Sequence, residues 1–389
     1  MTDSAEPAAS SATGPSPRDP LHALDARLVS RMQQLLAETL AGHRAALTAI
    51  APESATLVDA LTEFLDGGKL LRPRFCFWAG TATLGRTPSE TELDALARHG
   101  AAIELVQAAA LLHDDVIDHS PTRRGRPAVH VAAARRHAEQ ELSGDSEDFG
   151  VAVAIVLGDL ALSWAEELVG AGSAEAATDQ GAARRARGEF DRLRTEVMSG
   201  QFLDILHQAG GFESPADPEA AALAVIRWKT VPYSVLRPLR MGAALMGADD
   251  DQLELLSQWA IEVGTAFQLR DDLLSVIGDA EATGKPIGGD ITEGKRTVLL
   301  ARTSAAADDA QRALLAQTIG DPDAPVADVT AVRELMVSSG AVASVAQEVR
   351  DRAGRAQQLL EAAETFGTLG RSGLDLLADS ATELESLRL

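Results

Sequence analysis

The sequence predicts an all-α protein. Its 389 residues are 46% hydrophobic and 24% charged, which is enough to bury a large core, whereas aromatic residues, which favour strands, make up only 4%. Apolar residues recur at helical spacing, as in the run Leu28, Met32, Leu35, Leu36 and Leu40. We therefore expect long amphipathic helices and no pair of strands.

The expected helices follow one another from Leu21 onward, separated by short segments rich in glycine, proline and serine. Residues 1–20 carry Ser, Ala, Pro and Thr without hydrophobic periodicity, so we expect a disordered tail there. Residues 21–389 then form one domain whose central helices are more apolar than its outer ones. The breaks between helices are expected at Gly67–Gly68, Ser120–Pro127, Ser143–Gly150, Gly210–Pro218, Gly278–Gly294 and Gly320–Pro325.

The balance of charge argues against some classes of partner. The chain has 35 basic and 58 acidic residues, a formal net charge of -23 that repels nucleic acid. The one cysteine, Cys76, lies between Phe75 and Phe77 and is expected to be buried, as suits a reducing compartment. No stretch stays apolar over the roughly 18 to 20 residues of a membrane span, and no signal peptide is visible. We expect a cytoplasmic protein without stable membrane insertion.

A first group of acidic residues points to a divalent cation. Asp114, Asp115 and Asp118 fall within about one helical turn, so their carboxylates share one end of a helix. Like charges this close need a cation, and hard oxygen ligands suit Mg²⁺, which is often completed by water and substrate phosphate. The adjacent cations Arg123 and Arg124 stand out in an acidic chain and favour a phosphate group beside the metal.

A second acidic pair, Asp271 and Asp272, lies near the end of another expected helix and is followed by a glycine-rich segment that reaches Lys295. The two acidic helix ends are therefore expected to face each other across a cleft. Further upstream, Lys69 and Arg72 follow two glycines at an expected helix start, where free backbone N–H groups also favour an anion. This predicts another phosphate-binding cluster.

Taken in order, these motifs resemble the trans-isoprenyl diphosphate synthases, the polyprenyl synthetase family, over roughly residues 25–385. The resemblance implies an all-α isoprenoid synthase fold, with long antiparallel helices around a deep central cavity and the two acidic motifs at its mouth. It also implies a homodimer. The residues that carry it are Gly67-Gly68-Lys69, Arg72-Pro73, Asp114-Asp115-x-x-Asp118, Arg123-Arg124-Gly125, Gly200-Gln201, Lys229-Thr230, Phe267-Gln268, Asp271-Asp272 and Gly294-Lys295-Arg296.

The resemblance also implies a role for each matching residue. Mg²⁺ would be bound by Asp114, Asp118 and Asp271, with Asp115 and Asp272 supporting them, and would bridge the diphosphate of an allylic substrate (dimethylallyl, geranyl or farnesyl). Thr230 and Gln268 would line the position of the developing carbocation. The same allylic diphosphate would be held by Arg123, Lys229, Lys285 and Lys295, and that of the second substrate, isopentenyl diphosphate, by Lys69, Arg72 and Arg124.

The chemistry of such a reaction agrees with these residue types. Breaking an allylic C–O bond leaves a pyrophosphate anion, so metal ions and fixed cations supply the catalysis and no protein nucleophile is needed. The isopentenyl double bond then attacks the carbocation and a proton is lost, which the resemblance implies is taken up by the departing pyrophosphate. Because water would quench the cation, the cavity must be apolar and closed.

Two positions depart from the usual pattern of the family. Gln107 stands where many members have a histidine that contacts isopentenyl diphosphate, and an amide can still donate to a phosphate oxygen there. Ser275 replaces the third acidic residue of the second motif, and with Asp279 it loosely resembles the metal motif of class I terpene cyclases. A terpene cyclase is therefore one alternative, although it would have no use for the isopentenyl diphosphate cations. A non-catalytic partner subunit of a synthase is the other, although such subunits lose their acidic motifs.

The resemblance also implies that product length depends on the side chains just before the first acidic motif, because the growing tail descends along that helix. Ala109 and Ala110 are small, and Leu105 and Val106 one turn deeper are not aromatic, so the growing tail is not blocked. Each isoprene unit needs roughly one further turn, about 5.4 Å. We expect a product of at least C20, geranylgeranyl diphosphate being the first candidate. Tyr233 is expected to be a packing residue, and Asp204 to matter less than Gln201.

Overall fold

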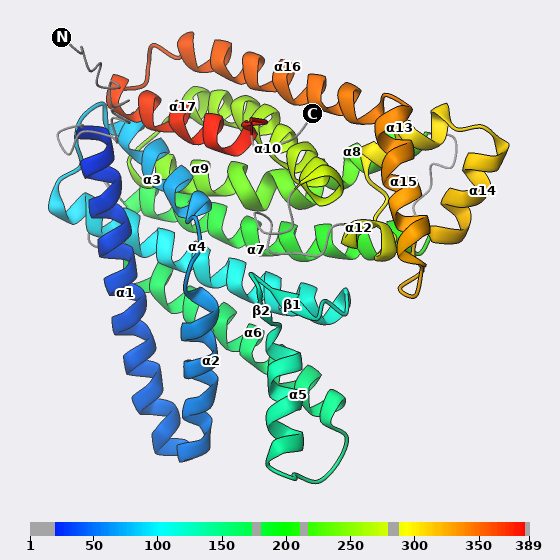
Figure 1. The fold of residues 1–389 in the computed structure, drawn as a ribbon. Helices are drawn as coiled ribbons and strands as arrows, with labels where there is room; N and C mark the ends of the chain where they lie inside the picture. The colour runs from blue at the N-terminus through cyan, green and yellow to red at the C-terminus, as the bar shows by residue number, and fades with distance from the viewer. Residues whose placement is uncertain (1–19, 173–179, 211–216, 279–287, 386–389) are drawn as a thin grey trace, which may run out of the picture.

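The computed structural model describes residues 20–172, 180–210, 217–278 and 288–385. The predicted disordered tail lies outside these residues except for Pro20, which begins the first helix, α1 (Pro20–Ile50). Lys285 and Asp279 also lie outside them. Within the described residues the fold consists of helices and one short hairpin, which confirms the prediction of an all-α protein. Helices α4, α7, α9 and α10 run across the middle of the molecule (Figure 1).

Two long helices, α4 (Glu90–Ile117) and α10 (Asp250–Ile277), form the centre of the fold. Each begins with a capping box. The side chain of Ser89 or Asp249 accepts a hydrogen bond from the backbone N–H of Glu92 or Gln252, whose side chain in turn accepts one from the backbone N–H of Ser89 or Asp249. Most of their apolar residues are buried. Both helices therefore start at fixed points and carry an acidic motif toward their C-terminal ends.

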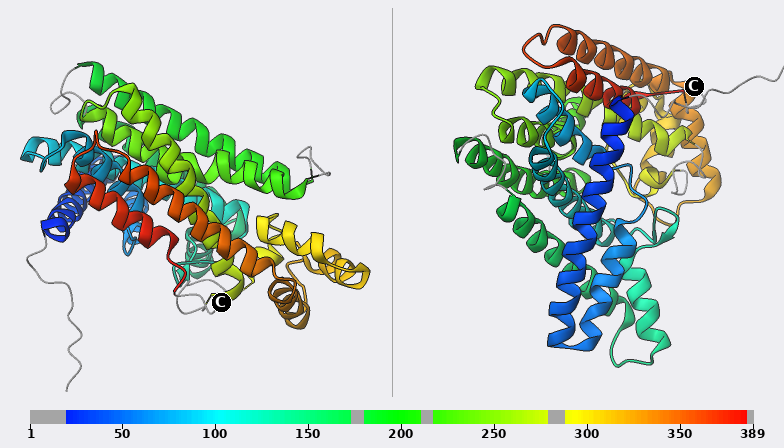
Figure 2. Two further views of the ribbon diagram at one scale, coloured as in Figure 1. Left: turned by 90° about the horizontal axis from the view of Figure 1, so that it is seen from above. Right: turned by 90° about the vertical axis from the view of Figure 1, so that its left-hand side faces the viewer.

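The remaining elements surround these two helices. α3 (Leu71–Leu84) packs against α4 and α9 (Arg237–Leu245), while α16 (Ala341–Glu361) packs along α10. Seen from above, many of these helices run roughly parallel to one another (Figure 2). The other elements are η1 (Pro52–Ser54), α2 (Ala55–Leu65), α5 (Val129–Glu139), α6 (Ser146–Gly172), α7 (Gln180–Gln208), α8 (Pro218–Val225), η2 (Ile226–Thr230), η3 (Pro232–Leu236), α12 (Gly289–Thr292), α13 (Val298–Ala306), α14 (Asp309–Thr318), α15 (Val326–Ser338) and α17 (Thr368–Thr382).

The prediction that no strands would pair is wrong at one place. The antiparallel strands β1 (Thr122–Arg123) and β2 (Arg126–Pro127) pair across a two-residue turn. The turn residues Arg124 and Gly125 both have positive φ, 51° and 74°. Such a turn matches the twist of a hairpin, but Arg-Gly is a much weaker sequence signal for it than Asn-Gly. The hairpin directly follows the first acidic motif.

Cys76 is buried, as predicted, at the contact between α3 and α9. Its carbonyl oxygen would lie only 1.8 Å from a Cβ atom on Gly242, so the two helices can touch here only because that residue is glycine. Burial raises the pKa of the Cys76 thiol well above its ordinary value. The thiol is therefore a packing group.

The expectation that no stretch is long and apolar enough to span a membrane is wrong for one helix. The α6 segment Ser146–Gly170 is long and apolar enough to do so, with 39% of its most apolar window buried. This helix packs against α4 and α5, as a core helix of a helical protein would. Its apolar side chains Phe149, Ile155 and Val156 are nonetheless exposed.

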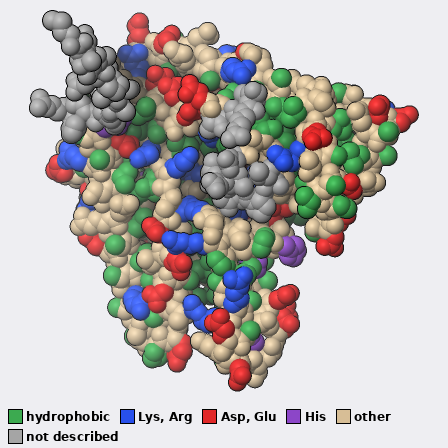
Figure 3. All heavy atoms as spheres, viewed as in Figure 1, with side chains coloured by type: hydrophobic (Ala, Val, Ile, Leu, Met, Phe, Trp, Pro, Cys, Tyr) green, Lys and Arg blue, Asp and Glu red, His purple; other side chains and the backbone are tan. Residues whose placement is uncertain are grey.

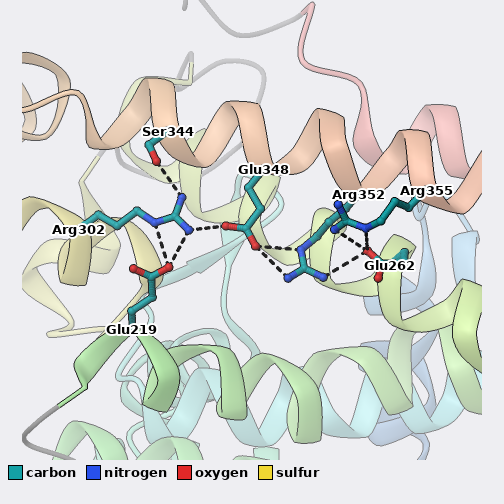
Figure 4. Close-up of polar contacts among 7 residues, drawn as sticks. All are labelled: Glu219, Glu262, Arg302, Ser344, Glu348, Arg352 and Arg355. Atoms are coloured by element: carbon teal, nitrogen blue, oxygen red, sulfur yellow. Dashed lines mark hydrogen bonds and ion pairs between the residues drawn. The ribbon is translucent and has the colours of Figure 1, made fainter.

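A network of ion pairs fixes α13, the helix that directly follows the segment containing Lys295 (Figure 4). Arg302 on α13 donates to Glu219 on α8 and pairs with Glu348 on α16, and Arg352 links Glu348 to Glu262 on α10. Arg302 is only 19% exposed, so the pairs are partly shielded from water. Helices α8 and α16 thus hold the middle of α13 directly, and α16 is itself tied to α10.

Candidate active site

A single cavity of about 1200 Å³ brings the two acidic motifs together. It lies between the C-terminal parts of α4 and α10, with α7, η2 and the segment before α13 closing its sides. This confirms the expectation that the acidic helix ends face each other. The predicted site residues that line it are Lys69, Ala110, Asp114, Asp118, Arg72, Arg123, Lys229, Thr230, Gln268, Asp271, Asp272 and Lys295.

The three aspartates of the first motif do not share one environment. Asp114 and Asp118 line the cavity, whereas Asp115, about 100° further round the helix, turns into the protein and is 2% exposed. Its Oδ1 accepts a 2.9 Å hydrogen bond from Nε of Arg123 and a second, shorter contact from the same guanidinium. Asp115 thus holds Arg123 at the cavity wall.

The negative charges of Asp114 and Asp118, the two aspartates of the first motif that line the cavity, are only partly balanced by nearby cations and hydrogen-bond donors. Oδ1 of Asp114 is buried and accepts no hydrogen bond from the described residues, and Nζ of Lys229 lies 3.8 Å away. Burial and the neighbouring charge of Asp114 raise the pKa of Asp118 to about 6. A cation placed between the two carboxylates would relieve both effects.

The second motif is tied to η2 by a chain of hydrogen bonds. Thr230 donates from Oγ1 to Oε1 of Gln268 over 2.7 Å, and Gln268 donates from Nε2 to Oδ1 of Asp272 over 2.8 Å. Asp272 is buried, and burial together with the charge of Asp290 raises its pKa well above the ordinary value. The hydroxyl of Ser275 donates a hydrogen bond to the backbone carbonyl oxygen of Asp272. Asp272 is therefore a buried support beside the cavity, and Asp271 is the more accessible carboxylate of the pair.

Two lysines stand among these carboxylates. Nζ of Lys229 lies 2.5 Å from Asp204 as well as near Asp114. Burial lowers the pKa of Lys229, but the charges of Asp204 and Asp114 outweigh it, so the net shift is upward. Lys295 is shared in the same way, at 2.7 Å from Glu293, 3.4 Å from Asp290 and 3.5 Å from Asp118. Both ammonium groups are thus charged and fixed.

The face of the molecule shown in Figure 3 reflects this arrangement. Lys and Arg side chains gather near its middle, and acidic side chains are spread around them. In a chain with a net charge of -23, such a gathering marks a place where an anion can be attracted.

A second cationic group lies beside the first, around the loop before α3. The guanidinium of Arg72 stacks on the ring of Tyr233 at 4.1 Å and donates to Ser234, and Arg124 donates to the backbone carbonyls of Phe64 and Asp66. Leu70, the residue directly before α3, is a non-glycine residue with a positive φ of 53°. Such backbone strain is often found at binding sites, where the surrounding structure enforces it.

Some predicted positions are placed elsewhere. Ala109, five residues before Asp114, points about 140° away from it and is buried in the core, so only Ala110 lines the cavity. Gln107 and Arg124 are not among the residues that line it either. The expectation that Asp114, Asp115 and Asp118 act as one face is thus wrong for Asp115, because that side chain pairs with Arg123.

Four residues of the site were underestimated from the sequence. Asp204 pairs with Lys229, Asp290 and Glu293 pair with Lys295, and Tyr233 supports Arg72. The spacing Gln201-x-x-Asp204 on one helix face was the available signal for Asp204, since both side chains line the cavity. Asp290 and Glu293 could have been noticed as acidic residues just before Lys295.

Comparison with known proteins identifies the family of the chain. A model of the family described as Polyprenyl synthetase matches residues 54–336. The chain belongs to the polyprenyl synthetase family. This polyprenyl synthetase is an enzyme that transfers prenyl groups, and its all-α fold is that of the isoprenoid synthases.

Individual relatives agree with the family match. A short chain isoprenyl diphosphate synthase of Methanothermobacter thermautotrophicus is 29% identical over 343 residues, covering 88% of this chain and 94% of that protein. A geranylfarnesyl diphosphate synthase of Aeropyrum pernix is 30% identical over 318 residues, covering 82% and 90%. The geranylgeranyl pyrophosphate synthase structure from Corynebacterium glutamicum, complexed with isoprenyl diphosphate and magnesium, superposes with a TM-score of 0.85 at 34% identity, covering 92% and 99%.

The pairing of Asp115 with Arg123 leads to a first prediction. Replacing Asp115→Asn in this polyprenyl synthetase leaves a buried guanidinium without its counter-charge, so stability should fall by about 3 kcal/mol. The measurement is denaturant unfolding. Asp59→Asn is the matched control, because Asp59 pairs with Arg44 on the surface, and it should cost less than about 1 kcal/mol. Equal losses in the two variants would show that the buried pair has no special role.

Proposed function

We propose that this enzyme elongates an allylic diphosphate with isopentenyl diphosphate, head to tail, with Mg²⁺ as cofactor. The observation that carries the proposal is the convergence of two acidic helix ends and two cationic groups on one cavity. Transfer of a prenyl group is a property of the family, and the chemistry of the cavity supports two diphosphates as its ligands. The relatives named above as isoprenyl and geranylgeranyl diphosphate synthases support the same substrates.

The residues present fit Mg²⁺. Asp114 has a buried oxygen with no hydrogen-bond donor among the described residues, Asp118 has a raised pKa, and Asp271 faces them from α10. These three would hold the metal, with Asp115 and Asp272 as buried supports. When bound, Mg²⁺ would neutralise the diphosphate and stabilise the charge that develops as its C–O bond breaks.

The lysines and Arg123 would hold the allylic diphosphate. Lys229 and Lys295 are already aimed into the cavity by Asp204, Asp290 and Glu293, so little reorganisation is needed when the anion binds. Arg123 is held in the same way by Asp115. Lys285, which lies outside the described residues, would join them on the resemblance alone.

The second cationic group would hold isopentenyl diphosphate. Lys69 and Arg72 line the cavity, Arg124 lies beside them, and Gln107 could add an amide donor from α4. The double bond of this substrate must reach the carbon that loses pyrophosphate. Thr230 and Gln268 line the same cavity, and their polar atoms are bonded to each other, so that they can line the carbocation without attacking it.

The cyclase and partner-subunit alternatives have less support. Ser275 donates to a backbone carbonyl, which commits its hydroxyl, and Asp279 lies outside the described residues. Lys69 and Arg72 line the same cavity as Asp114, Asp118, Asp271 and Asp272, and Asp115 pairs with Arg123 at its wall. A synthase uses all of these groups.

The proposal is tested by incubating the enzyme with Mg²⁺, labelled isopentenyl diphosphate and dimethylallyl, geranyl or farnesyl diphosphate in separate tubes, and sizing the products. A linear prenyl diphosphate is the expected result. A hydrocarbon or alcohol formed from an allylic diphosphate alone would favour the cyclase, and no reaction in any tube would favour the partner subunit.

Product length is proposed to be at least C20, because Ala110 leaves the cavity wall beside Asp114 open. Ala110→Phe should therefore shorten the product by at least one isoprene unit, as shown by chromatography of the dephosphorylated products. Ala109→Phe is the comparison: that side chain points into the core, so it should reduce the yield of folded enzyme without changing the product of the fraction that remains. Unchanged products from Ala110→Phe would contradict the proposed path of the tail.

The pKa of Asp118 makes metal binding sensitive to acid. Because Mg²⁺ binds the carboxylate, a proton competes with it below about pH 6, and the apparent affinity should weaken by up to about tenfold per pH unit there. Isothermal titration with Mg²⁺ between pH 5 and 8 measures this. Asp118→Asn should bind Mg²⁺ weakly with a flatter pH dependence, and an identical profile would contradict the role of Asp118.

The effect on the metal-free fold has the opposite sign. The folded-state pKa of Asp118 is raised above its unfolded value, so ionising this group destabilises the fold. That destabilisation is absent below about pH 4, the ordinary pKa of aspartate, and is complete only above about pH 6.

The homodimer and the cytoplasmic location also belong to this proposal. Exposed apolar side chains on α6 (Ile155 and Val156) and on α7 (Met198 and Phe202) support burial against a second copy rather than solvent. A second copy packed on α6 would cover its exposed apolar side chains without a membrane. Light scattering of the purified enzyme would report a dimer mass if this is so.

A further inference from the structure

Glu104 is a buried acid that the reaction described above does not use. It lies on α4, ten residues before Asp114, and its side chain is 2% exposed. Its Oε2 atom is buried and accepts no hydrogen bond from the described residues. A charged group in this position is costly unless opposite charges surround it.

Those opposite charges come from the second cationic group. A Cβ atom on Gly68 would lie 3.3 Å from Oε1 of Glu104 and 3.4 Å from Nη2 of Arg124, so carboxylate and guanidinium approach the same point of the loop. Burial raises the pKa of Glu104, and the charges of Arg72 and Arg124 oppose that shift. Nε of Arg72 is also buried without a partner among the described residues. The carboxylate of Glu104 and the guanidinium of Arg72 therefore attract each other, and each has a buried polar atom without a hydrogen-bond partner among the described residues.

We infer that Glu104 is a positioning residue for the second diphosphate subsite, where its buried charge holds Arg72 and Arg124 in place between turnovers. The inference rests on the proposed function. Lys69, Arg72 and Arg124 repel one another when no anion is bound. A carboxylate underneath supplies the opposing attraction and leaves the outer donors free for phosphate.

The two possible roles of Glu104 predict opposite changes in diphosphate binding when its charge is removed. If Glu104 were only a nearby negative charge, removing it would strengthen diphosphate binding. If it positions the arginines, removing it should weaken binding. Glu104→Gln keeps the shape of the side chain and removes the charge, so the Michaelis constant for isopentenyl diphosphate should rise about tenfold, with kcat and the Michaelis constant for the allylic substrate changing less than about twofold.

Glu189 offers a matched control. It is also a buried glutamate, 3% exposed, and it pairs with three arginines, Arg192, Arg237 and Arg240, but it lies outside the cavity. Glu189→Gln should lower the melting temperature without changing the Michaelis constant for isopentenyl diphosphate. Glu104→Asp, which restores the charge on a shorter side chain, should recover part of the affinity that Glu104→Gln loses.

The outcomes separate this inference from the proposed function. An unchanged or lower Michaelis constant for isopentenyl diphosphate in Glu104→Gln, with the wild-type enzyme active, would overturn the inference alone. Equal losses for both substrates would also overturn it, since they would indicate a structural role. If Glu104→Gln does not fold, Glu104→Asp decides by the same readout: a selective rise supports the inference, and none overturns it. An inactive wild-type enzyme would overturn the proposed function first.

Discussion

The structure depends on one unfavourable electrostatic arrangement, the convergence of carboxylates at the C-terminal ends of two helices. A helix C-terminus carries partial negative charge, and neither α4 nor α10 has a basic residue in its last turn. Asp114 and Asp118 therefore meet repulsion from the helix end and from each other, and Glu293 adds to the repulsion at Asp118. The fold tolerates this because cations from elsewhere in the chain are brought in. Lys229, Lys295 and Arg123 come from three different segments, and each is itself held by a second carboxylate.

The rest of the fold can be understood as support for those cations. The capping boxes fix where α4 and α10 begin, and therefore where their acidic ends stop. The hairpin of β1 and β2 returns Arg123 toward Asp115, eight residues earlier in the chain. The network around Arg302 fixes the helix that follows Lys295. Each of these devices is local, but all of them act on the same small volume, which explains why residues far apart in the sequence contribute to one site.

Much of this could be predicted from the sequence. Helical periodicity gave the fold class, and the pattern of Asp114, Asp118, Asp271 and the neighbouring cations located the site. What the sequence could not give was the direction of individual side chains and their partners. Asp115 and Ala109 are set apart from Asp114 and Ala110 only by their direction round the axis of α4. The sequence does not say which side of the helix faces the cavity, so it could not decide which member of each pair lines it. The hairpin was missed because Arg-Gly rarely adopts its turn, and Glu104 was passed over because a lone glutamate in an apolar helix has no pattern of its own.

The burial of Cys76 has a practical consequence. It is the only cysteine in the chain, it is fully covered, and its thiol ionises only well above neutral pH. Thiol-directed reagents should therefore leave the native enzyme unmodified at neutral pH. A cysteine introduced on any exposed helix would be labelled alone, without first removing the natural one. Fluorescent or spin probes could then be placed one at a time around the cavity mouth, to report on the binding of diphosphates there.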